Sequence, residues 1–326
     1  MEIWTDLDEV PPGKRRVVTV GNFDGVHRGH QRVVETCVRS AHSRELESVA
    51  LTFDPHPRSV HDPWNPTPLI MSLDSRLEAL ARTGLDAVFV AAYCEALYTL
   101  SAREFAKQYL ARGLGAEEVV VGEDFRFGAG NTGDIQTLRE LGEELGFTVT
   151  MVMDVRHSSG RRWSSSWVRK LLGEGRVDQA AKVLGHPYRL VGTVQHGHKR
   201  GRTLGFPTAN LDAGEGVLAP ADGVYAGWLV RDVPGHDQAQ EFLPAAISVG
   251  TNPQFDGAKR TVEAHVLGRN DLDLYDQEVA VVFEKRLRPM MRFDGVDALL
   301  DQMDQDLRES AAALGARPAT RLPVEE

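Results

Sequence analysis

The sequence contains few cysteines and no long hydrophobic run. Only Cys37 and Cys94 occur among 326 residues, and they do not form a CxxC pair. Without a framework of paired cysteines, we expect two reduced and buried thiols. No apolar stretch approaches the ~18 residues that a membrane helix needs, and no charged-then-apolar leader opens the chain. These absences predict a cytoplasmic protein that does not enter a membrane.

Basic segments are scarce as well. The formal net charge is −10 at pH 7, and no basic tail or basic helix is present. A general affinity for nucleic acid or for anionic membranes depends on such clusters, so we expect neither partner. Any recognition of phosphate must therefore be local. The length of 326 residues is typical of two domains that each bury a core, and it leaves open a monomer or a weak homo-oligomer.

The two halves of the chain differ in their hydrophobic pattern. Residues 1–185 alternate short β-branched runs with helical ones, which predicts a parallel sheet with helices on its faces. Residues 186–315 show short runs separated by Gly, Asn and Pro turns, which predicts an antiparallel barrel closed by a helix over 296–314. Residues 316–326 are expected to form a flexible tail.

Each half contains five predicted strands. The expected strands of the sheet are 16–20, 48–53, 87–91, 118–122 and 148–154, with helices over 31–43, 72–83, 102–113, 135–145, 166–173 and 177–184. The expected strands of the barrel are 188–195, 223–229, 241–249, 261–266 and 277–283.

The first candidate site is the run Gly21-Asn22-Phe23-Asp24-Gly25-Val26-His27-Arg28-Gly29-His30. It joins the strand over 16–20 to the helix over 31–43, so His27 and His30 fall in the first turn of that helix. Unpaired N–H groups and the helix dipole favour anions there. Glycines at three positions allow the backbone to approach a ligand closely. The run therefore predicts a phosphate site.

Three later segments of the first half have matching chemistry. His56 lies in the rigid loop Phe53-Asp54-Pro55-His56-Pro57, and residues 122–133 combine aromatic side chains with glycines. The third segment is Ser164-Ser165-Ser166-Trp167-Val168-Arg169. Hydroxyls, free N–H groups and an arginine at a helix start suit a polyphosphate.

The second candidate site begins at Gly205-Phe206-Pro207-Thr208-Ala209-Asn210, which we interpret as a rigid turn. It presents a hydroxyl and an amide oxygen two residues apart, and these are suitable ligands for a hard cation that carries nucleotide phosphates. Further along, the strand over 261–266 places Glu263 on its polar face. A carboxylate there is a candidate general base.

The motifs of the first half resemble those of bacterial FAD synthetases, which belong to the nucleotidyltransferase superfamily. The matching segments are GxFDGxHxGH, FDPHP, GxDFxFG and a form of SSTxxR in which Ser166 replaces threonine. The resemblance implies a Rossmann-like domain over 1–185 that transfers an adenylyl group to FMN. It implies that His27 and His30 neutralise charge on the phosphates during catalysis.

The same resemblance assigns the other residues of the first site. It implies nucleotide-binding roles for Gly21, Phe23, Asp24, Gly25, Ser165, Ser166 and Arg169. It places Asp124, Phe127 and Asn131 towards the flavin.

The motifs of the second half resemble those of riboflavin kinases. The resemblance implies a kinase domain over 186–315, in which the PTAN residues Thr208 and Asn210 bind magnesium and ATP, with Gly201 also at the nucleotide. Glu263, from the VE-x-H segment, would be the general base for the riboflavin 5′-hydroxyl, and Arg288 would lie beside the flavin.

The family as a whole is that of bifunctional riboflavin kinase/FMN adenylyltransferases. The chain would convert riboflavin to FMN and then FMN to FAD, with ATP as co-substrate and Mg²⁺ as cofactor. Two alternatives remain open at this point. One is a nucleotidyltransferase for another phosphorylated metabolite, with a barrel that only binds substrate. The other is a flavin-binding regulatory protein that has lost turnover.

Overall fold

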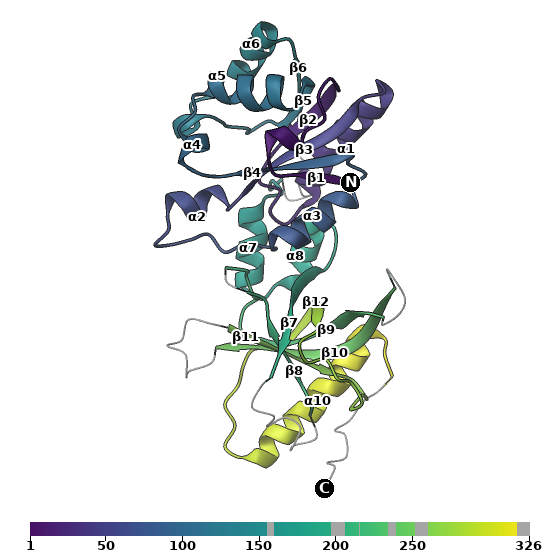
Figure 1. Cartoon of the computed structure of the whole chain (residues 1–326). Helices are drawn as coiled ribbons and strands as arrows, with labels where there is room; N and C mark the ends of the chain where they lie inside the picture. Colours follow the sequence, from purple (N-terminus) through teal and green to yellow (C-terminus); the bar gives the residue numbers. More distant parts are fainter. Residues whose placement is uncertain (155–159, 197–205, 215, 234–238, 252–259, 318–326) are drawn as a thin grey trace. The chain divides into compact units, whose positions relative to one another are not determined.

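A computed structural model describes residues 1–154, 160–196, 206–214, 216–233, 239–251 and 260–317. The chain divides into two compact units, residues 1–165 and 166–326. Figure 1 shows the helices and strands of the two units with their labels.

The first unit is built on a six-stranded sheet in the order β1-β4-β3-β2-β5-β6. Every neighbouring pair is parallel. The strands are β1 (Glu2–Trp4), β2 (Arg16–Val20), β3 (Glu47–Asp54), β4 (Ala87–Ala92), β5 (Ala116–Gly122) and β6 (Thr148–Val152). Parallel strands covered on both faces are largely apolar, and all five residues of β2 are buried, Arg16 and Thr19 included.

Helices cover both faces of this sheet. The helical elements are η1 (Leu7–Glu9), α1 (Arg28–Ser43), α2 (Pro57–His61), α3 (Leu73–Ala81), α4 (Glu95–Tyr98), α5 (Ala102–Phe105), η2 (Ala106–Gly113), η3 (Ala129–Asn131) and α6 (Ile135–Leu145). One core cluster joins Val17 of β2 to α1 and α3. The other joins Val18 and Val20 to α5, η2 and α6. Successive residues of β2 thus alternate between two hydrophobic cores.

The strand order places β2 between β3 and β5, which is where the order reverses. From β2 the chain continues to β3 and β4 on one side of β2, and then crosses to β5 and β6 on the other side. Ligands of open parallel sheets bind beyond the carboxyl ends of the strands at such a switch point. The run that follows β2 directly, residues 21–30, lies there.

The second unit is a closed six-stranded barrel in the order β10-β11-β8-β7-β12-β9. The described pairings are antiparallel. Its strands are β7 (Tyr188–Gln195), β8 (Ala209–Asp212), β9 (Gly223–Asp232), β10 (Gln240–Thr251), β11 (Arg260–Val266) and β12 (Glu278–Arg288). Helix α10 (Val296–Leu314) packs along β9, β10 and β12, as Figure 1 shows.

Helices α7 (Ser165–Gly173) and α8 (Val177–Leu184) connect the sheet to the barrel. The compact units meet at Ser165, whereas the sequence predicts a domain boundary after Gly185. The units divide earlier because α8 packs against β7 and β12 of the barrel. The backbone N–H of Ala221 also donates to the carbonyl of Leu172, at the end of α7.

The predicted fold class is confirmed, with corrections in detail. Strands β1 and β8 are additional to the predicted set, and the predicted helix over 102–113 is α5 continued by the π-helical segment η2. Cys37 is buried and reduced as expected, but Cys94, which stands at the N-cap position of α4 after β4 has ended, is exposed. The predicted tail over 316–326 lies mostly outside the described residues.

Candidate functional sites

The first site is organised by the turn between β2 and α1. Three of its residues have a positive φ: 48° at Phe23, 86° at Gly25 and 35° at Val26. Such values are costly for Phe and Val, and residues held in this way are concentrated at functional sites. Burial stabilises the conformation, because both Phe23 and Val26 are only 2% exposed. The chain is thus turned sharply into the start of α1.

His27 and His30 form one stacked pair at this helix start. His27 is the N-cap residue of α1, and its Nδ1 accepts a hydrogen bond from the backbone N–H of His30 at 3.3 Å. A neutral imidazole that accepts at Nδ1 carries its proton on Nε2. The two rings stack with centroids 3.7 Å apart, and the Phe23 ring meets His30 edge-on at 5.4 Å. His27 is buried and His30 partly exposed, so His30 is the more accessible of the two imidazoles.

Two glycines of this turn are explained by the rings beside them. A Cβ at Gly21 would lie 3.1 Å from the Phe23 ring, and one at Gly29 would lie 3.0 Å from Cε1 of His27. Both distances are shorter than ordinary contact. The glycine spacing in the sequence therefore reflects close packing of the aromatic side chains as well as access for a ligand.

Asp24 links the turn to two other segments of the chain through hydrogen bonds. Its carboxylate oxygens accept hydrogen bonds from the backbone N–H of Ile70 at 3.0 and 3.1 Å, and one of them also accepts from Met71 at 3.3 Å. Its carbonyl oxygen accepts from the Oγ of Ser165 at 2.8 Å. Asp24 thus ties residues 70–71 and the start of α7 to the turn. Ser166 and Arg169 lie further along α7, in the second unit, and their roles stay predictions.

Arg76 is a buried charge beside this turn that the sequence analysis missed. It is 4% exposed, and one of its terminal nitrogens donates to the carbonyl of Asn22 at 2.9 Å. Its guanidinium lies 3.7 Å from the carboxylate of Asp54. Desolvation lowers the pKa of Arg76, and the carboxylates of Asp24 and Asp54 oppose this shift. An arginine on a helix face that is otherwise apolar could have signalled this role.

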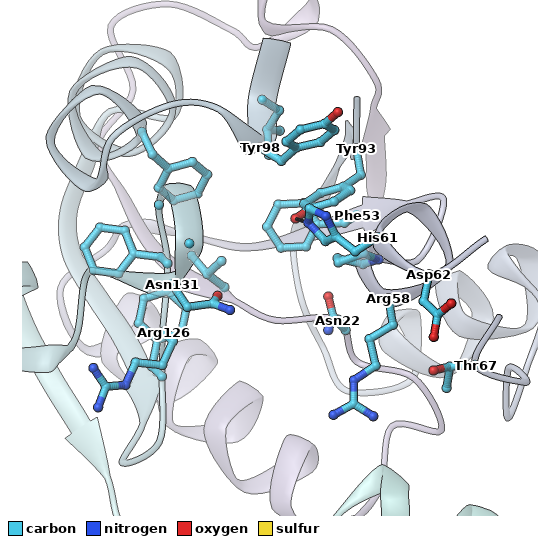
Figure 2. Close-up of a pocket in the computed structure, with 18 of the residues that line it drawn as sticks. Asn22, Phe53, Arg58, His61, Asp62, Thr67, Tyr93, Tyr98, Arg126 and Asn131 are labelled. Carbon is cyan, nitrogen blue, oxygen red and sulfur yellow. Dashed lines mark hydrogen bonds between the residues drawn. The ribbon is translucent and has the colours of Figure 1, made fainter. Parts of the chain in front are cut away.

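A cavity of about 810 Å³ opens beside the turn, at the carboxyl ends of the strands. Figure 2 shows Asn131 and Arg126 on one wall and Phe53, His61, Tyr93 and Tyr98 on the other, with Asn22 between them. Phe127 also lines the cavity, so two of the three residues predicted to contact flavin in the first site meet there. The walls combine aromatic side chains with polar and charged ones, among them Arg58, Asp62 and Arg126.

Tyr93 and Tyr98 were missed by the sequence analysis. The Nε2 of His61 lies 2.9 Å from the hydroxyl of Tyr93, and the His61 ring also contacts that of Tyr98. Burial raises the pKa of Tyr93. Both tyrosines follow the end of the strand predicted over 87–91, and this position could have indicated that they lie at a ligand site.

Asp124 is placed differently from Phe127 and Asn131. Its carboxylate pairs with Arg162 at 2.5 Å, and the same arginine lies 2.9 Å from the carboxylate of Asp154. Burial raises the pKa of Asp154 to about 6, an effect that Arg162 opposes. The predicted contact between Asp124 and flavin stays a prediction.

The second site lies where β8 and β11 pair. Asn210 is directly opposite Glu263 in the ladder, and the Thr208 hydroxyl donates to Oε2 of Glu263 at 3.5 Å. The structure thus brings together the hydroxyl, amide and carboxylate that the sequence singled out. It differs from the predicted rigid turn in that Ala209 and Asn210 already belong to β8.

Burial determines the electrostatics of Glu263. Desolvation raises its pKa, and the hydrogen bond from Thr208 lowers it to a smaller extent. A carboxylate with a raised pKa is a stronger base than an exposed one.

Arg288 forms an ion pair with a residue of α10, the helix that packs on the barrel. Its guanidinium forms two hydrogen bonds with the carboxylate of Asp306, at 2.6 and 2.8 Å, and it lies over the Phe293 ring. Its predicted role beside the flavin stays a prediction. Gly201 lies outside the described residues.

Comparison with known proteins identifies both halves of the chain. The family model for FAD synthetase matches residues 11–167, and the one for riboflavin kinase matches residues 184–314. A bifunctional riboflavin kinase/FMN adenylyltransferase of Escherichia coli strain K12 is 35% identical over 295 residues, which cover 90% of this chain and 91% of the relative. The corresponding enzyme of Pseudomonas fluorescens is also 35% identical, over 98% of this chain and 100% of the relative.

This chain belongs to the bifunctional riboflavin kinase/FMN adenylyltransferase family. The family predicted from the motifs is confirmed, as is the prediction of an enzyme with a kinase half and an adenylyltransferase half. A solved structure from Streptococcus pneumoniae, described as a macrolide-efflux protein, superimposes with a TM-score of 0.83 at 30% identity. It covers 95% of this chain and 97% of its own. Within the described residues, no helix is both long and apolar enough to cross a membrane.

Proposed function

We propose that the chain phosphorylates riboflavin with ATP to give FMN, and then transfers the adenylyl group of a second ATP to FMN to give FAD and pyrophosphate. The observation that carries this proposal is the contact between Thr208 and Glu263 opposite Asn210. A barrel that only bound substrate would have no use for a half-buried base beside a hydroxyl and an amide. The family relationship supports the same activities.

In the kinase reaction, Glu263 takes the proton of the riboflavin 5′-hydroxyl. The hydroxyl oxygen attacks the γ-phosphorus of ATP, the bond to the β-phosphate oxygen breaks, and ADP leaves. Thr208 and Asn210 would hold Mg²⁺ with the nucleotide phosphates, since both provide the oxygen ligands that Mg²⁺ prefers. The metal would supply charge neutralisation on these phosphates.

In the adenylyl transfer, a phosphate oxygen of FMN attacks the α-phosphorus of ATP, and pyrophosphate leaves. No protein nucleophile takes part, so catalysis depends on positioning and on charge neutralisation. His27, which can donate from Nε2, and His30 stabilise negative charge at the N-terminus of α1, where the helix dipole adds to their effect. Ser165, Ser166 and Arg169 hold the departing pyrophosphate.

The cavity beside the first site accepts the flavin of FMN. Phe127 and the aromatic wall of Phe53, Tyr93 and Tyr98 suit the isoalloxazine ring, and Asn131 offers a polar contact at its edge. Asn22 lines this cavity and also belongs to the turn that leads to His27 and His30, so the FMN phosphate can lie towards His30.

Chromatography of the products formed from riboflavin, ATP and Mg²⁺ tests the proposal. FMN should form first and FAD later. FAD formation from supplied FMN without any kinase activity would favour a nucleotidyltransferase with a binding barrel. Flavin binding without product, seen by absorbance titration, would favour a regulatory protein. The variants Glu263→Gln and His30→Ala should each strongly lower the rate of one reaction and retain the other.

A further inference from the structure

Thr208 lies just outside the paired part of β8. The ladder with β11 runs through Leu211, Asn210 and Ala209, and its last pair is Ala209 with Ala264. Continuing that register would place Thr208 opposite His265. The preceding residue, Pro207, has no N–H with which to extend the ladder. Backbone pairing therefore fixes Asn210 more firmly than Thr208.

The side chain of His265 provides a link where the ladder ends. Its Nδ1 lies 2.7 Å from the carbonyl oxygen of Pro207, and since a carbonyl only accepts, Nδ1 is the donor. The ring is 4% exposed and packs on Phe206, with centroids 5.7 Å apart. Within the described part of the chain, Nε2 has no hydrogen-bond partner. The Nδ1 bond is thus the ring's one polar link there.

We propose that His265 is a positioning residue for phosphoryl transfer, which holds residues 206–208 against β11 so that the Thr208 hydroxyl stays on Glu263. His265 and Glu263 are two residues apart on one strand, so both side chains project from the same side of β11. The strand that presents the base therefore also fixes the hydroxyl beside it. This inference rests on the roles proposed above for Thr208 and Glu263.

A pair of variants with the same shape tests the hydrogen bond alone. In His265→Asn, the amide nitrogen takes the approximate place of Nδ1 and retains the donor. In His265→Leu, the side chain has nearly the same volume but no donor. The kinase kcat of the Leu variant should fall about 10- to 100-fold, because misplacement of a positioning group by about 1 Å can cost that much. Its KM for riboflavin should change less than about threefold, and the Asn variant should keep kcat within about threefold.

FAD formation from supplied FMN serves as an internal control in every sample, since none of the residues proposed for it lies on β8 or β11. It should stay at the wild-type rate in both variants. Unchanged kinase kcat in a folded Leu variant would overturn the proposal. So would a loss of kcat that is equal in the Asn and Leu variants. If the Leu variant does not fold, His265→Gln replaces it, because its amide reaches towards the Nε2 position rather than Pro207.

Combining His265→Leu with a variant that lacks the Thr208 hydroxyl separates this inference from the proposed function. In Thr208→Ala, the hydroxyl is already absent, so adding His265→Leu should lower kcat by less than about threefold further. A full additional loss would mean that His265 does not act through Thr208, and would refute the positioning role. Wild-type kinase activity in Thr208→Ala alone would instead refute the role proposed for Thr208.

Discussion

Replacing Gly29 with alanine should impair adenylyl transfer without unfolding the protein. Gly29 is the second residue of α1, where alanine is normally the better helix former. Here the new methyl group would lie 3.0 Å from Cε1 and 3.1 Å from Nδ1 of His27, closer than ordinary contact. The imidazole must therefore move by a few tenths of an ångström, away from the position in which it caps α1.

The expected magnitudes follow from this displacement. Helix propensity favours alanine by at most ~1 kcal/mol, and weakening the N-cap costs ~0.5–2 kcal/mol. The two effects nearly offset each other, so the free energy of unfolding should change by less than ~1 kcal/mol. Catalysis is more sensitive. If 1 Å of misplacement costs roughly 100-fold, a few tenths of an ångström should lower FAD formation about 3- to 10-fold.

The assay is the rate of FAD formation from FMN and ATP, compared with the rate of FMN formation from riboflavin by the same sample. The matched control is Gly173→Ala at the end of α7, where a Cβ would meet nothing within 4 Å. The control should keep both rates. Wild-type FAD formation in the Gly29→Ala variant would refute the reasoning, because His27 would then tolerate displacement.

Four further predictions concern Glu263, Asp24 and the second histidine. Glu263→Gln should lower FMN formation by about 10²- to 10⁴-fold and leave the conversion of FMN to FAD intact, measured by product chromatography. Because burial raises the pKa of Glu263 and its carboxylate accepts the proton, kinase kcat/KM should decline on acidification at a higher pH than an exposed glutamate would give; a pH–rate profile checks this. His30→Ala should lower FAD formation about 100-fold or more with the kinase unaffected, in the same assay. Asp24→Asn should cost ~1–3 kcal/mol in chemical denaturation, because its amide N–H₂ group would face the backbone donor of Ile70.

The sequence predicted most of the fold because its hydrophobic periods are strong. The β-branched run before the histidines and the apolar spacing after them define β2 and α1, and both elements form nearly where expected. Strand β8 could not be predicted, because its four residues begin only two positions after Pro207 and form a strand through pairing with β7 and β11. Long-range pairing of this kind leaves no local signal.

The candidate sites show the same division between local and long-range information. The motif that contains His27 and His30 is continuous in sequence, so its chemistry could be inferred directly. Arg76 and Tyr98 come from segments that are distant from this motif in sequence, and only folding of the sheet brings them to the carboxyl ends of the strands. The pairing of Arg288 with Asp306 likewise depends on how α10 packs along the barrel, which periodicity alone does not specify.

The two thiols differ in burial, and this difference allows one of them to be labelled selectively for spectroscopy. Burial raises the pKa of Cys37 to about 12, so this thiol is inert towards electrophiles at neutral pH. Cys94 is exposed and sits beside Tyr93, one of the residues lining the cavity. A maleimide fluorophore would therefore attach at one position without any engineering. Its emission would report ligand entry in an enzyme of native sequence, in real time and separately from turnover.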